Sequence, residues 1–416
     1  MTRAFHGERG SFALMLAIAT SLTTAKGTVE IVYPPYLAGY GYSLSLIGFL
    51  TSVIAFLQLF SRVPAGVAYR AHRAQRQYAI ALVLFAATIG GFAFAQGQGV
   101  AIAALSALHG LAFGALGTLG LALAIDLSGG RRAGPAMAWY TAAISTGYAL
   151  GSLIGGSLAE TIGMAQTLAI IAVLPLLAAG AVFALPSLAG APQVFDRGTG
   201  VRGLLAAGAR LDSRVWLAVV IVLYLNVQRD ALDTFFPIFG PTVGISFAVV
   251  GVLRAIKSGA GVFMRLTIAV LLHAVDYRRV TLIAVVALAA GTFVVPMTSS
   301  VVALGAIFIV LGLCGGVLRA TSAANIAELR SEGRDVGLAS GVYNMGLDIG
   351  GIIGPALGGA IASVVGIGSM FQIVAIGSFA AWLVVALSSA TTREAAGLAK
   401  RHTIGPAATT GGEHRG

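Results

Sequence analysis

Twelve apolar stretches run along the chain, and each is long enough for a helix to cross a lipid bilayer, which takes about 20 mostly apolar residues. Hydrophobic residues make up 57% and charged residues 10% of the 416 residues, whereas a soluble globular chain carries about 25% charged residues. We therefore expect an all-α membrane protein with twelve transmembrane helices. The expected spans are 11–37, 44–69, 77–96, 99–126, 135–160, 164–186, 214–239, 246–272, 280–298, 301–327, 337–364 and 369–390.

Basic residues are sorted to one side of these spans. Of the 26 lysines and arginines, 19 lie in the terminal segments and in the loops that follow every second span, and the other loops contain none. Loops rich in Lys and Arg stay on the cytoplasmic side. Both termini are therefore predicted to be cytoplasmic, in a protein of the cytoplasmic (inner) membrane. The sorting explains the net charge of +11 without nucleic acid as a partner.

The chain also repeats itself at an offset of 203 residues. Residues of distinctive chemistry align in order: Lys26 with Arg229, Glu30 with Asp233, Pro34 with Pro237, Arg62 with Arg265, Tyr140 with Tyr343 and Gly151 with Gly354. Shared apolar composition would align leucines and valines at any offset, but not these residues. The repeat predicts two homologous six-helix halves, an arrangement typical of secondary transporters with a site between the repeats.

The repeat and the composition together predict five segments. The longest connection is rich in Gly, Pro and Arg, and the C-terminal segment has no apolar face, which is typical of disorder. The segments are a cytoplasmic N-terminus (1–10), a six-helix bundle (11–186), a cytoplasmic linker (187–213), a second six-helix bundle (214–390) and a disordered cytoplasmic tail (391–416).

Two motifs resemble those of the major facilitator superfamily. The loop after the second span keeps the glycine and basic residues of the pattern G-x-x-x-D-R-x-G-R-R, with Arg70 at the usual Asp position. The family's helix-five glycine pattern occurs in both halves, where small residues let helices pack closely. The residues expected at these contacts are Gly147, Gly151, Gly155, Gly350, Gly354, Pro355 and Gly358. The resemblance covers residues 10–390. It implies two pseudo-symmetric six-helix bundles, alternating access and a central path lined by helices 1, 4, 7 and 10.

Ionisable residues inside the expected spans are the candidates for a site. Each costs about 2.5–3.5 kcal/mol at the bilayer centre on insertion scales, so we expect them to face a cavity between the halves. The candidates for binding a substrate or a proton are Lys26, Glu30, Arg229, Asp230, Asp233, Arg254, Lys257, Arg319, Asn344 and Asp348. Five are cations and four are carboxylates, which favours an anionic or zwitterionic small solute.

Spacing suggests how some of these charges pair. Lys26 and Glu30 are four residues apart on one helix face, and so are Arg229 and Asp233. Two interpretations stay open for these pairs: closed ion pairs that only hold the halves together, or groups that act in binding.

Asp348 aligns with Ser145 in the repeat, so it is not an inherited scaffold feature. We expect it to carry a proton or to be the counter-ion of Arg254 or Lys257. Asn344, four residues earlier, shares its helix face and is expected to orient a substrate.

The basic loops suggest a gate. In the family, the loop Asp helps to hold helices 2 and 11 together, and here Arg70 replaces it. We expect a charge-swapped latch of Arg70, Arg73 or Arg76 against Glu332 or Asp335, with Asp276 against Arg131 or Arg132 in the other half. Each exposed pair is expected to contribute under about 1 kcal/mol.

The expected function is secondary active transport of a small organic solute, coupled to H⁺. The chain has no nucleotide-binding GxxxxGK[ST] loop, and its six histidines show no HExxH spacing. We therefore expect no enzyme activity, no cofactor and no metal. The expected partners are the solute, H⁺ and membrane lipid, with the protein as a monomer. Two alternatives stay open: a proton/drug antiporter that exports amphipathic or cationic compounds, and a transporter-like receptor without flux.

Overall fold

The computed structural model describes residues 2–128, 133–186, 213–271, 277–331 and 336–403. Every regular element among these residues is a helix. Twelve candidate spans within the described chain are long and apolar enough to cross a membrane. The predicted all-α fold with twelve transmembrane helices is confirmed.

The first half contains six spans. Its elements are α1 (Thr2–Gly39), α2 (Leu44–Ala68), η1 (Ala71–Arg73), α3 (Ala74–Phe94), α4 (Gly99–Leu127), α5 (Ala133–Ile162), α6 (Met164–Ile171) and α7 (Val173–Val182). The last two helices together form the single span expected at 164–186, which the structure gives as Met164–Val182. Pro175 has no backbone N–H and therefore cannot donate to the carbonyl of Ile171, four residues earlier. Helix α6 ends at Ile171.

The second half repeats this order. Its elements are α9 (Ser213–Thr242), α10 (Phe247–Leu271), α11 (Tyr277–Val294), η2 (Val295–Met297), α12 (Val301–Ser331), α13 (Val336–Val365) and α14 (Ile367–Thr403). The described part of α14 passes the expected end of its span at 390. Disorder was predicted from 391, and the structure describes residues 391–403 as a continuation of α14, where residues that favour helix are frequent.

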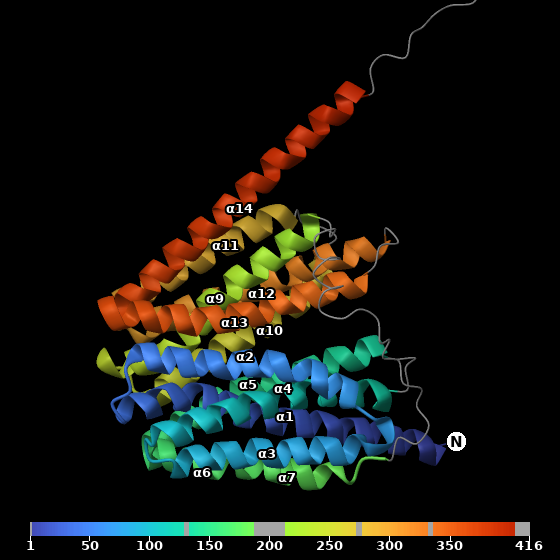
Figure 1. The fold of residues 1–416 in the computed structure, drawn as a ribbon, viewed down its shortest axis with the longest axis vertical. Coiled ribbons are helices and arrows are strands. Elements are labelled where there is room, and N and C mark those ends of the chain that lie inside the picture. The colour runs from blue at the N-terminus through green and yellow to red at the C-terminus, as the bar shows by residue number, and fades with distance from the viewer. Residues whose placement is uncertain (1, 129–132, 187–212, 272–276, 332–335, 404–416) are drawn as a thin grey trace, which may run out of the picture.

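The two halves lie side by side as two bundles. Figure 1 shows α1 to α7, in blue to green, on one side of the molecule and α9 to α14, in lime to red, on the other. The halves meet along two seams, α2 against α13 and α5 against α10. Each seam therefore pairs one helix from each repeat.

Glycines bring the backbones together within each half. The ladder on α5 packs against α1, where a β-carbon on Gly155 would lie 2.9 Å from Ile31 Cγ2. The repeat-related ladder on α13 packs against α9, where a β-carbon on Gly358 would lie 3.1 Å from Phe235 Cε2. Small residues allow this approach, since larger ones would separate the helices.

Both seams have close glycine contacts near one end of the molecule, which we call the short-loop end because it carries the connections 40–43, 95–98, 243–246 and 298–300. A β-carbon on Gly48 would lie 3.0 Å from the Cα of Gly359, and one on Gly156 would lie 2.9 Å from the Cα of Gly251. These two contacts are related by the repeat.

One hydrogen bond reinforces the α5–α10 seam at the short-loop end. Glu160 Oε2 accepts from the backbone N–H of Ala248, 2.6 Å away, in the first turn of α10. A carboxylate at a helix N-terminus satisfies an N–H that has no partner within the helix.

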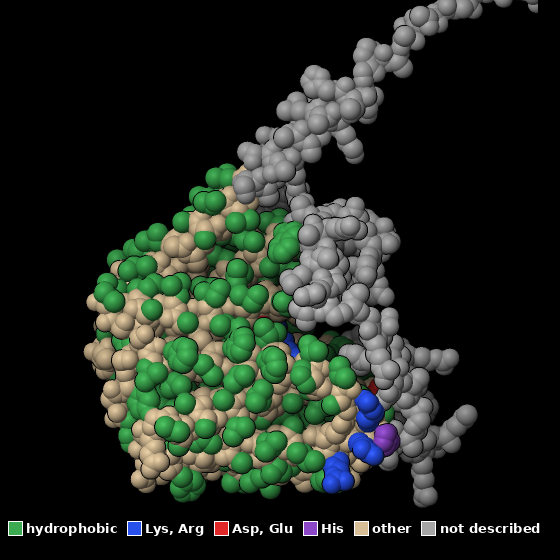
Figure 2. All heavy atoms as spheres, in the orientation of Figure 1, with side chains coloured by type: hydrophobic (Ala, Val, Ile, Leu, Met, Phe, Trp, Pro, Cys, Tyr) green, Lys and Arg blue, Asp and Glu red, His purple; other side chains and the backbone are tan. Residues whose placement is uncertain are grey.

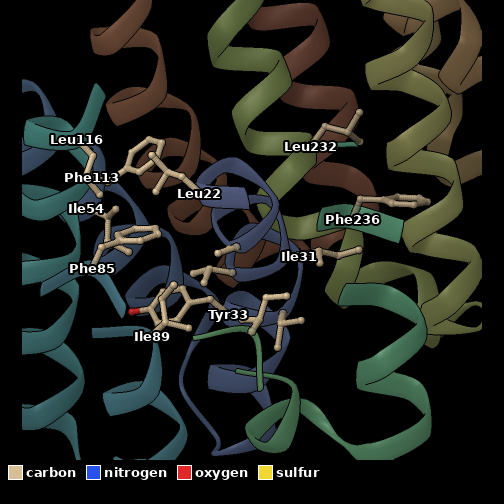
Figure 3. Close-up of a cluster of buried hydrophobic side chains, with 14 of the residues drawn as sticks. Leu22, Ile31, Tyr33, Ile54, Phe85, Ile89, Phe113, Leu116, Leu232 and Phe236 are labelled. Carbon is tan, nitrogen blue, oxygen red and sulfur yellow. The ribbon is translucent and has the colours of Figure 1, made fainter. Parts of the chain in front are cut away.

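Apolar side chains fill the interior between the helices. Figure 3 shows such a cluster, with labelled residues from five helices: Leu22, Ile31, Tyr33, Ile54, Phe85, Ile89, Phe113, Leu116, Leu232 and Phe236. Hydrophobic side chains also cover much of the surface in Figure 2, while the Lys and Arg side chains visible there gather mainly at one edge. An apolar belt of this kind suits a lipid environment.

Candidate functional site

Two adjoining cavities lie between the halves. They measure about 260 Å³ and about 360 Å³, and both are lined from α1, α5, α9, α10 and α12. All seven Lys and Arg residues outside the terminal segments and basic loops line one or both cavities: Lys26, Arg62, Arg229, Arg254, Lys257, Arg265 and Arg319. Four carboxylates line them too: Glu30, Asp230, Asp233 and Asp348. The structure thus places every charged candidate at one site.

Asp233 on α9 is the centre of an ion-pair network. Its Oδ2 lies 3.5 Å from Nε of Arg229, and its Oδ1 lies 3.7 Å from Nε of Arg254. Lys257 Nζ donates to the same Oδ1. Three cations thus surround one carboxylate, and two of them, Arg229 and Arg254, also pair with Asp230 and Glu30. A charge held out of water requires such close partners.

Arg254 connects the halves. Its side chain is buried, with 4% exposure, and its Nη2 lies 3.6 Å from Oε2 of Glu30 on α1 while its Nε faces Asp233. Its Nη1 is buried and has no hydrogen-bond partner among the described residues. The guanidinium therefore bridges a carboxylate of each repeat and keeps one donor group unused.

Both pairs predicted from four-residue spacing are present. Lys26 Nζ lies 3.4 Å from Oε1 of Glu30, and Arg229 pairs with Asp233 as given above. Neither pair is closed, because Arg254 reaches both carboxylates. A network across the halves replaces the isolated intrahelical pairs.

Asp348 pairs with a residue that the sequence did not suggest. Arg62 Nη1 on α2 donates to Asp348 Oδ2 at 2.8 Å, across the α2–α13 seam. The prediction that Asp348 is the counter-ion of Arg254 or Lys257 is wrong. Both of those cations lie on α10 and pair with Glu30 or Asp233, whereas α13 packs against α2 and α9.

Two further arginines have neutral partners. Arg265 on α10 donates from Nη2 to Ser145 Oγ at 3.3 Å and from Nε to the carbonyl of Gly261 at 3.2 Å. Arg319 on α12 donates from Nη2 to Asn226 Oδ1 at 3.2 Å. Both arginines line the smaller cavity.

The remaining candidates lie at the larger cavity. Asp230 Oδ1 is 3.8 Å from Nη1 of Arg229, so this carboxylate is held more loosely than Asp233. Asn344 lines the same cavity as Asp348, one helical turn away. Its exposed side chain suits contact with a solute.

The gate residues are only partly described. Arg70 donates from Nη1 to the carbonyls of Val67, at 2.7 Å, and Tyr69, at 2.9 Å, a way in which basic side chains cap a helix C-terminus. Arg73 and Arg76 are exposed. The other residues of the predicted latch lie outside the described residues: Arg131, Arg132, Asp276, Glu332 and Asp335.

Next to this cap, Tyr69 donates to Asp126 Oδ2 at 2.5 Å. Burial and the neighbouring carboxylate raise the pKa of Tyr69 above its usual value of 10.0, so its hydroxyl stays protonated. This contact fixes the end of α2 to the end of α4.

Sequence reasoning missed Arg62, Arg265 and Ser145 as parts of the site. Both arginines lie inside expected spans but were not named among the candidates, and both line the cavities. The repeat contained the signal, since Arg62 aligns with Arg265 and Ser145 aligns with Asp348.

A repeated twelve-span fold around a charged central cavity defines a membrane transporter by architecture. The chain matches the Major Facilitator Superfamily over residues 14–310 and 227–408, and it belongs to this family.

Solved structures share the fold at low identity. The nucleoside transporter NupG has a TM-score of 0.74 at 14% identity, over 90% of this chain and 98% of that chain. A point mutant of NupG has a TM-score of 0.71 at 17% identity, over 91% of this chain and 98% of that chain. A bacterial homologue of the human lysosomal transporter Spinster, in an inward-facing and unoccupied conformation, has a TM-score of 0.68 at 14% identity. The match covers 92% of this chain and 95% of that chain. No curated protein matches the sequence.

Proposed function

We propose that the chain is a secondary active transporter that moves a small anionic or zwitterionic organic solute across the cytoplasmic membrane by alternating access, coupled to H⁺. Arg254 carries the proposal, because its guanidinium lies between Glu30 of one half and Asp233 of the other, in the wall of both cavities. A solute that binds here acts directly on the contact that joins the halves.

The network suggests how solute and proton are linked. An anionic solute in the smaller cavity, which Arg254 lines, attracts the guanidinium of this residue and so competes with Glu30 and Asp233. A carboxylate that loses its cation while it stays out of water is costly as an anion, and this cost disappears when it takes up a proton. Solute binding and proton binding then favour each other.

The charge distribution supports an orientation. The basic loops favour the cytoplasmic side, which places the short-loop end outside. The glycine contacts bring the seams together at that end, which supports a form closed to the outside. The likeness to an inward-facing Spinster homologue supports the same assignment.

A proton/drug antiporter is the second candidate, and Asp230 favours it. Its 3.8 Å separation from Arg229 is the longest ion-pair distance among the described cavity charges. An acid held this loosely can accept a cationic compound. The surplus of cations at the cavities argues against this alternative, because it repels such a compound.

Flux into proteoliposomes with an imposed pH gradient tests the proposal. The solutes are organic anions, zwitterionic amino acids, cationic dyes and, because of the likeness to NupG, uncharged nucleosides. We expect gradient-dependent movement of an anion or zwitterion and its loss in Arg254→Gln. Movement of the dyes alone identifies the antiporter. Binding without flux identifies a receptor, and either result overturns the proposal.

A further inference from the structure

The two seams carry repeat-related polar contacts that differ in charge. Arg62 on α2 pairs with the Asp348 carboxylate at 2.8 Å. The positions related by the 203-residue offset are Arg265 on α10 and Ser145 on α5, which meet at 3.3 Å. The two repeat-related arginines therefore differ in their partners: Arg62 faces a carboxylate, and Arg265 faces a neutral hydroxyl.

Arg265 has a second arginine beside it. Gly316 of α12 packs so closely on α10 that a β-carbon there would lie 3.3 Å from the backbone nitrogen of Arg265. Arg319 follows Gly316 by three residues, about one helical turn, and lines the same cavity as Arg265. The two guanidinium groups thus come from adjacent helices to one cavity of about 260 Å³.

Among the described residues, no carboxylate of the cavities forms an ion pair with Arg265 or Arg319, although Asp230 attracts Arg319 over a longer distance. Glu30 pairs with Lys26 and Arg254, Asp230 with Arg229, and Asp348 with Arg62. Asp233 is held by its three cations on α9 and α10. Each ion pair recorded for the described carboxylates thus uses a cation other than Arg265 or Arg319, whose side chains donate to Ser145, Gly261 and Asn226 instead.

Among the described residues, seven cations and four carboxylates line the two cavities, an excess of three positive charges. Unpaired charge is costly in a membrane interior, and a guanidinium binds a carboxylate through two parallel hydrogen bonds. The cost at Arg265 and Arg319 is removed when an anion binds between them.

We infer that Arg265, Arg319 and the Ser145 hydroxyl form the subsite for the negative group of the solute, which is an organic carboxylate. The solute carboxylate takes the place that the Asp348 side chain has in the other seam. The inference rests on the proposed function. It adds where the negative group of the solute binds, and it explains why no carboxylate of the protein is paired with the arginines there.

The test introduces a carboxylate into the protein at the place where the solute carboxylate is expected to bind. Ser145→Asp places an acid beside Arg265, as Asp348 lies beside Arg62, and Ser145→Asn has a similar size without the charge. The probes are lactate, succinate and benzoate, each compared with its uncharged amide at equal ionic strength. Binding is measured as the rise in Tm of the purified full-length protein in detergent, since a ligand that binds only the folded form raises Tm.

We expect at least one carboxylate, but not its amide, to raise the Tm of the wild-type protein. We expect the apparent affinity for this carboxylate to be at least about tenfold lower in Ser145→Asp than in Ser145→Asn, which corresponds to the loss of one charge-assisted contact. Ser145→Asp without ligand has a higher Tm than Ser145→Asn, because the new acid pairs with Arg265. If Ser145→Asp does not purify, Arg319→Gln replaces it and loses carboxylate binding in the same assay.

Three results overturn the inference: equal binding of carboxylate and amide, equal affinity in Ser145→Asp and Ser145→Asn, or no carboxylate binding at all. Flux separates this failure from failure of the proposed function. If a zwitterion moves in proteoliposomes and its affinity is the same in Ser145→Asp and Ser145→Asn, transport stands and only the subsite is wrong. If no solute moves and none binds, both are wrong.

Discussion

Arg62 and Asp348 form an ion pair of 2.8 Å between α2 and α13, at positions separated by 286 residues. Asp348 is half of a contact between the repeats and also lines a cavity. Its protonation therefore acts on the α2–α13 seam.

Replacing Asp348 with Asn tests whether this carboxylate carries a coupled proton in addition to Glu30 or Asp233 at Arg254. Asn keeps the size and removes the charge, so we expect uptake driven by a pH gradient to fall by about tenfold or more, as for an acid in a membrane proton relay. Exchange of labelled for unlabelled solute should fall much less. Both are measured in proteoliposomes, with Asp348→Glu as the matched control. Wild-type accumulation by Asp348→Asn would exclude Asp348 as the carrier.

Arg254→Gln should destabilise the protein, because Glu30 and Asp233 lose a buried shared partner. Removing one member of a buried ion pair costs about 3–5 kcal/mol, and the other cations around Asp233 reduce this here to about 2 kcal/mol. Thermal unfolding in detergent measures the loss. Arg73→Gln, at an exposed loop position, is the control and should shift stability by under about 0.5 kcal/mol. Equal shifts in the two variants would contradict the bridging role.

Alanine at Gly48 or Gly251 should prevent closure at the short-loop end. A β-carbon on Gly48 would collide with the carbonyl oxygen of Pro355, and one on Gly251 would lie 2.5 Å from that of Ser152. Backbone atoms cannot move aside as a flexible side chain can, so the seams must separate.

Thiol labelling reports this separation. Thr51→Cys places a thiol at the larger cavity, and the native Cys314 is buried, so background labelling is low. We expect several-fold faster labelling from the short-loop side in Gly48→Ala than in Gly117→Ala, where a β-carbon meets nothing within 4 Å. Equal rates would show that Gly48 does not limit closure.

The charge-swapped latch predicts a rescue. Arg70→Asp and Asp335→Arg should each reduce transport, and the double reversal should restore it because the attraction is re-formed with opposite signs. Initial uptake rate is the measurement. A double variant no more active than the weaker single variant would mean that Arg70 serves as the helix cap seen at Val67 and does not pair with Asp335.

Much of the fold follows from the sequence because its signals are local or repeated. Span lengths and the offset of 203 residues predict the helices and the two halves, and four-residue spacing predicts Lys26–Glu30. Local patterns could not predict the helix break before Pro175 with certainty, because many membrane helices tolerate proline when neighbours satisfy the freed carbonyl.

Most of the site's charged residues could be named from the sequence, but their partners could not. Periodicity gives the face of one helix and says nothing of how neighbouring helices are rotated about their axes. The bridge from Arg254 to Glu30 and the pair of Arg62 with Asp348 depend on that rotation. Arg62 and Arg265 align in the repeat, but the repeat alone does not show that either side chain points into a cavity.

The hydrogen bond between Glu160 and Ala248 has no repeat counterpart of the same kind. The residue related to Glu160 is Ser363, whose hydroxyl donates to the Ala360 carbonyl in its own helix. The α5–α10 seam thus has its carboxylate contact at the short-loop end, and the α2–α13 seam has its carboxylate pair further toward the opposite end. Rocking the halves apart at either end strains a different helix pair. We therefore expect that the balance between a form open at the short-loop end and a form open at the opposite end can be shifted through two separate contacts, and that changing one leaves the other in place.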